Sequence, residues 1–328
     1  MLGRLLTVGL LLAGQVRGEQ TGRVDALALG FADAVPAERL GVFIKSFLQH
    51  SPAHSELVLF AYDNPPNVSL YGPRVSVVRS ARSEGVDLSN HRYALFREHV
   101  EHLFPAPRLL LNSDVSDVVF QANPFVGDAA GVVYTSLEGD RTLGDGSLVA
   151  HFNNKWISNI QRCGKIVQSS DLDSWEVVCS GFSTGRAQPM LAYWRAMERE
   201  LKTCFGNVKG QDQGVHEYLI HQETPNGVRF ELLDSFSSPL ATLSHILELM
   251  RKNPGVKLLE PSDYTRTALG EQIHFPDALV PCVRRTGRRQ MCYDESGYFY
   301  NAEGNLPAVV HQYNRFHELE QLIFHRWL

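Results

Sequence analysis

Strand-like and helix-like segments alternate along the first 140 residues, and this alternation most constrains how the chain can fold. Short apolar runs predict buried strands, because a strand covered on both faces needs no polar alternation. The amphipathic segments between them, such as 40–48 and 93–103, repeat their apolar side chains at helical spacing. Strands that alternate with helices favour the α/β class, with a mostly parallel sheet flanked by helices. The expected strands are 26–31, 57–62, 75–78, 108–113 and 132–135.

Composition supports one large globular domain. The chain has 328 residues, of which 44% are hydrophobic and 20% are charged, so it can bury a sizeable core and is not mainly disordered. Two domains would also fit this length, but no linker or repeat divides the chain, and one domain of about 300 residues is the better interpretation. The formal net charge of −5 provides no basic field for nucleic acid. No apolar run approaches the ~20 residues of a membrane span.

Residues 1–18 resemble a secretory signal peptide. A positive residue precedes a short apolar run, 5–13, and we expect cleavage after Gly18. The alternatives are an ordinary buried helix and an uncleaved anchor, for which the run is short. We therefore expect residues 19–328 to form the domain, and the protein to lie in the Golgi or ER lumen or to be secreted. The glycosylation sequon at 67–69 agrees weakly with that route.

The cysteines are interpreted in the light of this oxidising route, in which disulfides persist. They are Cys163, Cys179, Cys204, Cys282 and Cys292. None of their spacings matches a zinc site. The spacings suggest that Cys163 pairs with Cys179, and that Cys282 pairs with Cys292. Cys204 would then stay free, although spacing alone leaves other pairings open.

An acidic turn after a triple-leucine strand is the main functional signal. Asp114 and Asp117 come directly after the predicted strand at 108–113. Ligands of open α/β sheets bind beyond the carboxyl ends of the strands, and two carboxylates there can hold a hard divalent cation. Such an ion can neutralise a diphosphate. The alternative is a pair of solvated turn residues, of which one caps a helix.

Four ordered segments resemble nucleotide-diphospho-sugar transferases of the GT-A fold. The segments are Asp114–Phe125, similar to D-V-x-D-V-x-F-Q-x-x-P-F; Cys179–Gly185, similar to C-S-G-x-x-x-G; 211–216, similar to D-Q-G-x-H; and 310–315, with Arg326 and Trp327 further on, similar to V-H-Q-Y-D-R. The resemblance covers roughly 24–328. It implies a single GT-A (Rossmann-like) domain with a mostly parallel mixed sheet. It also implies a hexosyltransferase-like enzyme that moves a sugar from a nucleotide-diphosphate donor to a hydroxyl of a glycan or glycoprotein acceptor.

Members of this family usually bind Mn²⁺ or Mg²⁺ through an acidic D-x-D element. The resemblance places Asp114 and Asp117 in that role, with Asp117 the better candidate for direct ligation. It also implies His311, after the strand-like residues 309–310, as a third ligand, and a mixed carboxylate and imidazole set suits Mn²⁺. A structural role is the alternative for His311. The literal D-x-D at 171–173 is a competing candidate, although its polar context predicts a loop.

Further candidates would contact the donor or the reacting sugar. Gln213 and the carboxylate of Asp212 are the candidate catalytic groups. Asp212 is flanked by glycines, which allow close approach of the backbone. It would activate the acceptor hydroxyl in an inverting transfer, or face the sugar in a retaining one; helix capping is the alternative. An arginine of the helix before the acidic turn would suit the phosphates, or else lie on the surface. The candidate donor-binding residues are Asp63, Arg92, Arg97, Asp114, Ser180 and Gly181.

Three departures from the family pattern motivate an alternative function. Ser116 stands where the family has Arg, and Asn123 and Asn314 stand where it has Asp. A catalytically inactive GT-A domain, acting as a secreted glycan- or nucleotide-binding module, is therefore the second hypothesis. An unrelated metal-dependent hydrolase that uses the same acidic turn is the third. The lack of H-E-x-x-H and G-x-G-x-x-G elements favours the first two.

Overall fold

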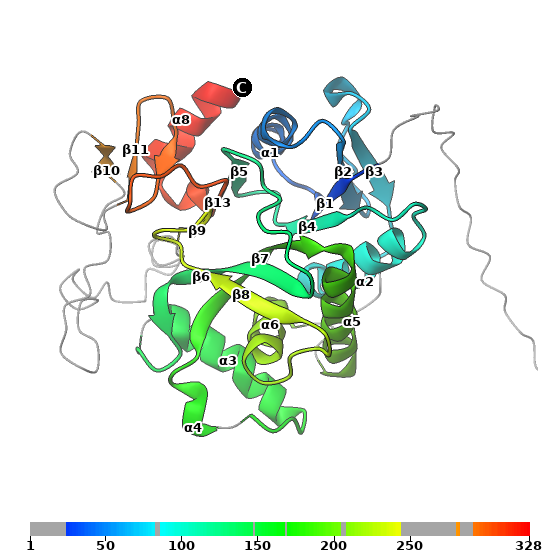
Figure 1. Cartoon of the computed structure of the whole chain (residues 1–328), viewed down its shortest axis with the longest axis vertical. Coiled ribbons are helices and arrows are strands. Elements are labelled where there is room, and N and C mark those ends of the chain that lie inside the picture. The colour runs from blue at the N-terminus through cyan, green and yellow to red at the C-terminus, as the bar shows by residue number, and fades with distance from the viewer. Residues whose placement is uncertain are drawn as a thin grey trace, which may run out of the picture.

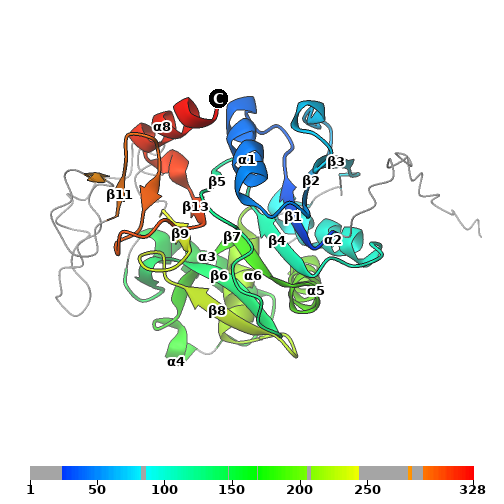
Figure 2. The same cartoon turned by 45° about the horizontal axis from the view of Figure 1, so that its top comes forward.

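The structure is a computed structural model. It describes residues 24–82, 86–146, 148–167, 169–204, 208–243, 280–282 and 291–328. The expected signal peptide, 1–18, lies outside the described residues. Figure 1 shows how the elements are arranged, and Figure 2 shows the same molecule turned forward. Within the described ranges, no helix combines the length and apolar character needed to cross a membrane.

Strands and helices alternate along the first half of the chain, as the sequence predicts. The strands are β1 (Ala26–Phe31), β2 (Ser55–Ala61), β3 (Val75–Arg79), β4 (Leu109–Ser113), β5 (Val118–Phe120), β6 (Val132–Thr142), β7 (Glu176–Arg186), β8 (Arg229–Leu233), β9 (Leu240–Thr242), β10 (Val280–Pro281), β11 (Cys292–Tyr293), β12 (Phe299–Tyr300) and β13 (Val309–His311). The helices are α1 (Ala37–His50), α2 (Leu88–Glu101), α3 (Leu148–Arg162), α4 (Ser169–Leu172), α5 (Ala187–Cys204), α6 (Gln211–His221) and α8 (His317–Trp327), with short 3-10 turns η1 (Ser69–Tyr71) and η4 (Tyr313–Arg315).

The main sheet is mixed and mostly parallel. Among the described residues it has seven strands, in the order β3-β2-β1-β4-β7-β6-β8. Strands β1 to β4 pair in parallel, as do β6 and β8. Only β7 among these strands runs antiparallel, to both of its neighbours β4 and β6. The expected α/β fold with a mostly parallel mixed sheet is therefore confirmed, and it is compatible with a single Rossmann-like domain.

Helices cover both faces of this sheet, and Figure 1 shows α3, α5 and α6 below it and α1 above it. Successive strand residues point to opposite faces. In β4, Leu110 therefore packs in the core beside α5, whereas Leu109 and Leu111 pack in the core beside α1. A strand buried on both faces needs apolar residues at every position. This explains the apolar runs from which the strands were predicted.

A smaller sheet joins the end of the chain to its middle. Its order is β5-β13-β9, and His311 of β13 lies opposite Val118 of β5. The backbone N–H of Gln312 also donates to the carbonyl oxygen of Asp117 at 2.7 Å. Because Asp117 directly precedes β5, this pairing carries His311 to the acidic turn after β4.

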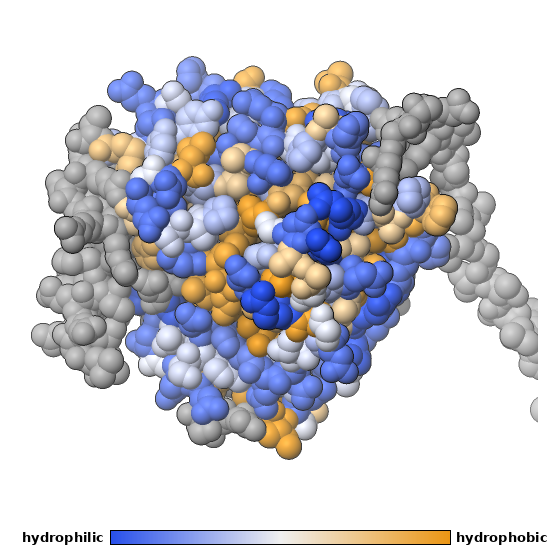
Figure 3. All heavy atoms as spheres, in the orientation of Figure 1, coloured by the Kyte–Doolittle hydropathy of each residue, from blue (hydrophilic) through white to orange (hydrophobic). Residues whose placement is uncertain are grey.

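One face of the molecule is seen in Figure 3, where hydrophobic side chains gather near the middle and hydrophilic ones surround them. Large apolar side chains exposed within the described ranges belong to separate segments: Leu70, Phe104, Ile166, Leu306 and Leu328. Isolated exposed apolar residues are normal on protein surfaces. These exposed residues therefore give no reason to assign a protein-binding surface to any of these segments.

One of the two expected disulfides is confirmed and the other is wrong. Cys282 and Cys292 are joined, as predicted. Cys179 is instead a buried free thiol inside β7, and Cys163, just after α3, has its disulfide with another cysteine. Spacing misled the prediction because Cys179 lies within β7, where its thiol contacts His311 of β13 and not a cysteine. The side chain of Cys204 lies outside the described ones.

Candidate functional site

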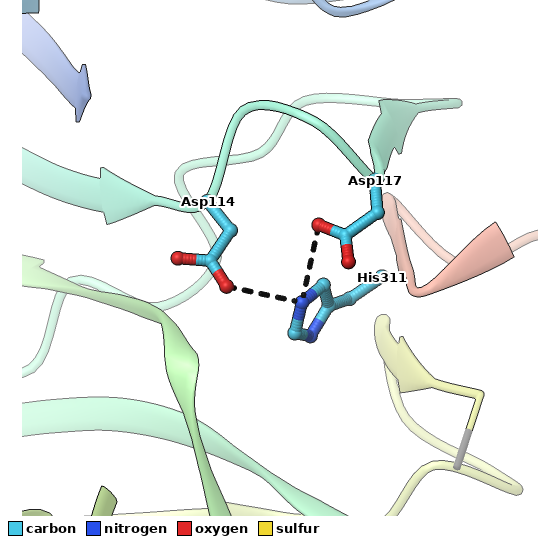
Figure 4. Close-up of side chains that lie close together, drawn as sticks. All are labelled: Asp114, Asp117 and His311. Atoms are coloured by element: carbon cyan, nitrogen blue, oxygen red, sulfur yellow. Dashed lines mark ion pairs between the residues drawn. The ribbon is translucent and has the colours of Figure 1, made fainter. Parts of the chain in front are cut away.

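Two side chains of the acidic turn meet a third from near the end of the chain, at one edge of the main sheet (Figure 4). Asp114 follows β4, Asp117 precedes β5, and His311 ends β13. The Nε2 atom of His311 lies 3.4 Å from Asp114 Oδ2 and 3.6 Å from Asp117 Oδ1. One possible ligand atom from each residue falls within 4.8 Å of the others. Figure 4 shows both carboxylates turned toward the imidazole, and we call these residues the triad.

The donor atoms of the triad suit a divalent cation. Asp117 Oδ1 and His311 Nε2 are both buried, and among the described residues neither atom has a hydrogen-bond partner besides the approaches of 3.4 and 3.6 Å within the triad. Buried polar atoms are rarely left in this state, because losing water without a replacement partner is costly. Two carboxylates and one imidazole form a mixed oxygen and nitrogen set, which can hold a divalent cation. Within the described part of the chain, no other group of His, Cys, Asp or Glu side chains has this arrangement.

Gly181 has no side chain, and this makes room for the three side chains of the triad. A Cβ atom at this position would lie 2.3 Å from His311 Cε1 and 2.8 Å from Asp114 Oδ2. The carbonyl oxygen of Gly181 also accepts the backbone N–H of Asp114 at 2.7 Å. The residue thus positions Asp114 through its backbone while it contributes no side chain. This is a physical reason for the glycine in the C-S-G segment.

The second ring nitrogen of His311 contacts the free thiol. Its Nδ1 atom lies 3.3 Å from Cys179 Sγ, and a partner on this side orients the ring so that Nε2 faces the carboxylates. Burial alone would lower the pKa of His311, but Cys179, Asp117 and Asp114 together raise it well above its ordinary value. Burial raises the pKa of Cys179.

Arg92, on α2, links the triad to Asp212. Its buried guanidinium donates to Asp114 Oδ1 and also to Asp212 Oδ2, the latter at 2.7 Å. Burial opposes the charge of Asp114, but Arg92 and His311 outweigh it and hold the pKa of Asp114 well below its ordinary value. At Asp212, burial dominates over the opposing charge of Arg92 and raises the pKa. The guanidinium of Arg92 therefore holds Asp114 and Asp212 close to each other.

A cavity of about 820 Å³ opens beside the triad. Its size lies within the range of about 300–1,000 Å³ that is typical of small-molecule sites. Most of the residues proposed from the sequence line it: Arg92, Asp114, Asp117, Ser180, Gly181, Asp212, Gln213 and His311. The structure thus brings these residues together, although contact with a ligand stays a prediction.

Two candidates lie away from this cavity. Asp63 is exposed in the turn after β2, 3.6 Å from Arg82. Asp171 and Asp173, the ends of the literal D-x-D, are exposed in and just after α4. Neither Asp63 nor this D-x-D lines the cavity.

Arg97 also lies elsewhere, although it shares α2 with Arg92. Its guanidinium pairs with Glu198 of α5 at 2.6 Å and with Glu101 one turn further along α2. Five residues of an α-helix rotate a side chain by about 140° relative to the first. One helix therefore cannot aim both arginines at the same cavity, and the structure aims Arg92.

Among the cavity residues that were not predicted from the sequence, three lie on one strand and one helix. Glu138 comes from β6, whereas Asn153 and Trp156 come from α3. Asn153 and Trp156 are three residues apart, which places them on one helix face. The spacing could predict that both residues share a helix face, but it could not predict that this face lies beside the acidic turn.

Comparison with models of protein families gave no match, and comparison with curated protein sequences gave none either. The geometry of the site and the four segments are therefore the features that bear on function.

Proposed function

We propose that the protein is a glycosyltransferase that depends on a divalent cation. It would move a sugar from a nucleotide-diphosphate donor to a hydroxyl of a glycan or glycoprotein acceptor. The observation that carries the proposal is the triad of Asp114, Asp117 and His311 in the wall of a ligand-sized cavity. The sequence resemblance supports it, because each of its four segments contributes residues to this one cavity. Such convergence is not expected if the four matches arose independently by chance.

The charges around the triad suit a diphosphate. A divalent cation held by the triad would offset the negative charge of the leaving diphosphate. Arg315, in the closing segment, and Lys209, before α6, line the same cavity. Their positive charges would attract the phosphate oxygens and raise the local concentration of an anionic donor.

A second cavity, of about 380 Å³, extends the site toward β1. It shares Ser89, Arg92 and Asp114 with the larger cavity. Its other walls include residues 33–36 after β1, Ser113 at the end of β4, and 115–116 in the turn that follows. Ligands of open α/β sheets bind at such strand ends. We assign the nucleoside to this cavity and the sugar to the larger one. The diphosphate would then cross the shared wall at Asp114.

Asp212 is proposed to face the reacting sugar. It lines the larger cavity and accepts hydrogen bonds from Arg92 at 2.7 Å and from Ser180 Oγ at 3.3 Å. Through Arg92 it is held at a defined position relative to Asp114. A carboxylate fixed in this way can bind a hydroxyl or stabilise positive charge that develops on the sugar.

A thermal-unfolding panel on the full chain tests the proposal. Nucleoside diphosphates and nucleotide-sugars of uridine and guanosine are added with Mn²⁺ or with a chelator. A ligand at about 100 times its Kd adds about 2.7 kcal/mol of stability, so we expect one nucleotide to raise the Tm, and only with Mn²⁺. Asp117→Ala should abolish this rise, whereas Asp171→Ala, an exposed aspartate away from the cavity, should keep it. No Mn²⁺-dependent rise with any nucleotide would contradict the proposal.

Turnover separates the enzyme from the inactive binding module. Asn123 does not by itself favour the module, because its Oδ1 accepts the N–H of Phe125 at 3.1 Å, as an aspartate would. Ser116 lines the smaller cavity, where the family arginine would have contributed a cation. Release of free nucleoside diphosphate from a donor would support the enzyme. Binding without release would favour the module.

A further inference from the structure

Part of the larger cavity is formed by side chains that the triad does not use. These are Glu138, Asn153, Trp156 and Gln213, and we call them the polar–aromatic wall. They come from three separate elements, β6, α3 and α6. The group combines hydrogen-bonding side chains with a flat apolar ring, which is a common composition of sites that orient a small polar ligand.

An irregularity in β6 turns Glu138 into the cavity. Leu137 lies opposite Val178 of β7, but the next paired residues are Thr142 and Glu176. Residues 138–141 therefore stand opposite a single residue of β7. Extra residues of this kind re-aim side chains, and they are frequent next to active sites. Glu138 is 3% exposed and still lines the cavity, so a carboxylate has been placed there at the cost of its hydration.

The polar members of the wall are connected to one another. The side-chain amide of Gln213 donates to Glu138 Oε2 at 2.9 Å and to Asn153 Oδ1 at 3.1 Å. Burial raises the pKa of Glu138, and the neighbouring amides of Gln213 and Gln312 and the charges of His311 and Arg315 oppose that rise. Asp212 differs, because it is paired directly with a guanidinium. A carboxylate surrounded by amides can accept hydrogen bonds from the hydroxyls of a neutral ligand.

Two glycines leave the room that the side chain of Trp156, the aromatic residue of the wall, occupies. A Cβ atom at Gly210 would lie 2.8 Å from Trp156 Cζ2, and one at Gly214 would lie 2.5 Å from Trp156 Cβ. Gly210 also has a φ of +73° at the start of α6, which favours glycine. The glycines on either side of Asp212 thus have a packing reason. They let α6 approach α3 so that the indole stands beside the polar side chains.

We propose that the polar–aromatic wall binds the sugar of the donor and selects a neutral, hydroxyl-bearing sugar over an acidic one. A pyranose has hydroxyls around its rim and a less polar C–H face, which match the amides and carboxylate on one side and the indole on the other. The carboxylate of a uronic acid would instead meet Glu138, and two carboxylates at close range repel each other. This inference rests on the proposed function, and it names the substrate class of that site.

Calorimetric binding to the full chain in Mn²⁺ tests the inference. The probes are UDP, UDP-glucose and UDP-glucuronate, with GDP and GDP-mannose as the second series. The wild-type chain should bind the neutral sugar conjugate at least about tenfold more tightly than the nucleoside diphosphate alone, as expected for hydrogen bonds to a charged group. It should bind the uronate conjugate more weakly than the neutral one. This comparison needs no variant.

Variants then assign the effect to the wall. Glu138→Gln should remove about tenfold of the affinity for the neutral conjugate and narrow its preference over the uronate, while affinity for the nucleoside diphosphate stays unchanged. Trp156→Ala should act in the same way, and Trp156→Phe should retain more affinity. Glu217→Gln is the matched control, because Glu217 is fully buried on α6 but does not line the cavity.

The outcomes separate this inference from the proposed function. Binding of a nucleoside diphosphate with no gain from its neutral sugar, or with equal affinity for the uronate, would overturn the sugar-binding role alone. A loss of diphosphate affinity in Glu138→Gln as large as the loss for the sugar conjugate would also overturn it. Failure of every nucleoside diphosphate to bind would overturn the proposed function, and this inference with it.

Discussion

The thiol of Cys179 touches His311 instead of another cysteine, and this contact is open to a direct test. A partner on the outer nitrogen of a ligating histidine usually contributes about 10- to 100-fold to metal affinity. We expect Cys179→Ala to weaken Mn²⁺ binding by roughly this factor, because Nδ1 loses its partner at 3.3 Å. Cys179→Ser keeps a hydrogen-bonding atom and should lose less. Titration of the full chain with Mn²⁺ measures both, and equal affinity in wild type and Cys179→Ala would refute a positioning role.

His216 should make the free energy of unfolding depend on pH in the acidic range. The ring is buried between Tyr193 Oη, 2.8 Å from Nδ1, and Thr135 Oγ1, 3.2 Å from Nε2. Burial, assisted by the charge of Arg92, lowers its pKa from 6.5 to about 3. Between these values the unfolded chain binds a proton that the folded chain does not. Stability should therefore fall as the pH drops through this window, by up to about 1.4 kcal/mol per pH unit from this residue.

Urea unfolding between about pH 4 and pH 7 measures the effect of His216. Because glutamine does not titrate, His216→Gln should give a shallower fall in unfolding free energy than wild type over the same range. The other titrating groups are common to both proteins, so the difference in slope reports on this residue. Parallel slopes would mean that His216 contributes nothing to the acid sensitivity.

Among the single elements, α2 owes part of its stability to the residue that caps its N-terminus. The side chain of Asp87 accepts the backbone N–H of Ser89 at 3.0 Å, which caps the helix that carries Arg92. Asp87→Ala should lower the free energy of unfolding by about 1 kcal/mol. Glu98→Ala, at an exposed position of the same helix, should change it by less than about 0.5 kcal/mol. Equal effects of the two substitutions in urea unfolding would show that the cap does not stabilise α2.

Helices and strands were predicted well where apolar residues repeat at a regular spacing over neighbouring positions. The segment 40–48 repeats its apolar residues at helical spacing, and Leu40, Phe43, Ile44 and Phe47 are all buried in α1. The strand expected at 132–135 is longer, because β6 continues to Thr142 through its irregular section. That section follows no hydrophobic period, so nothing in the residues themselves predicted how it would aim Glu138.

For the whole molecule, the route through the cell can be tested at one exposed turn. Asn67 lies before η1, where its Oδ1 accepts hydrogen bonds from Ser69 N and Oγ at 3.1 and 2.8 Å. It lines neither cavity, so a glycan there would not block the site. We predict that the chain expressed in secretory eukaryotic cells shifts in mobility on treatment with an N-glycosidase, and that Asn67→Gln does not shift. Secreted protein without such a shift would refute this modification.

By itself, the sequence determined the α/β class and the position of the acidic turn. Both depend on neighbouring residues, since hydrophobic period and turn chemistry act over a few positions. His311 was expected only through the resemblance to a family, because nothing next to it in the chain marks it as a ligand. The register between β5 and β13 is what sets it against Asp117.

Tertiary structure decided which side chains share the cavity. It separated Arg97 from Arg92, left Cys179 beside His311 instead of Cys163, and brought Glu138 to Gln213. Each of these outcomes depends on strand order, strand register or the packing of one helix on another. Such long-range relations are set by the burial of whole faces against each other, and a local pattern of residues does not contain them.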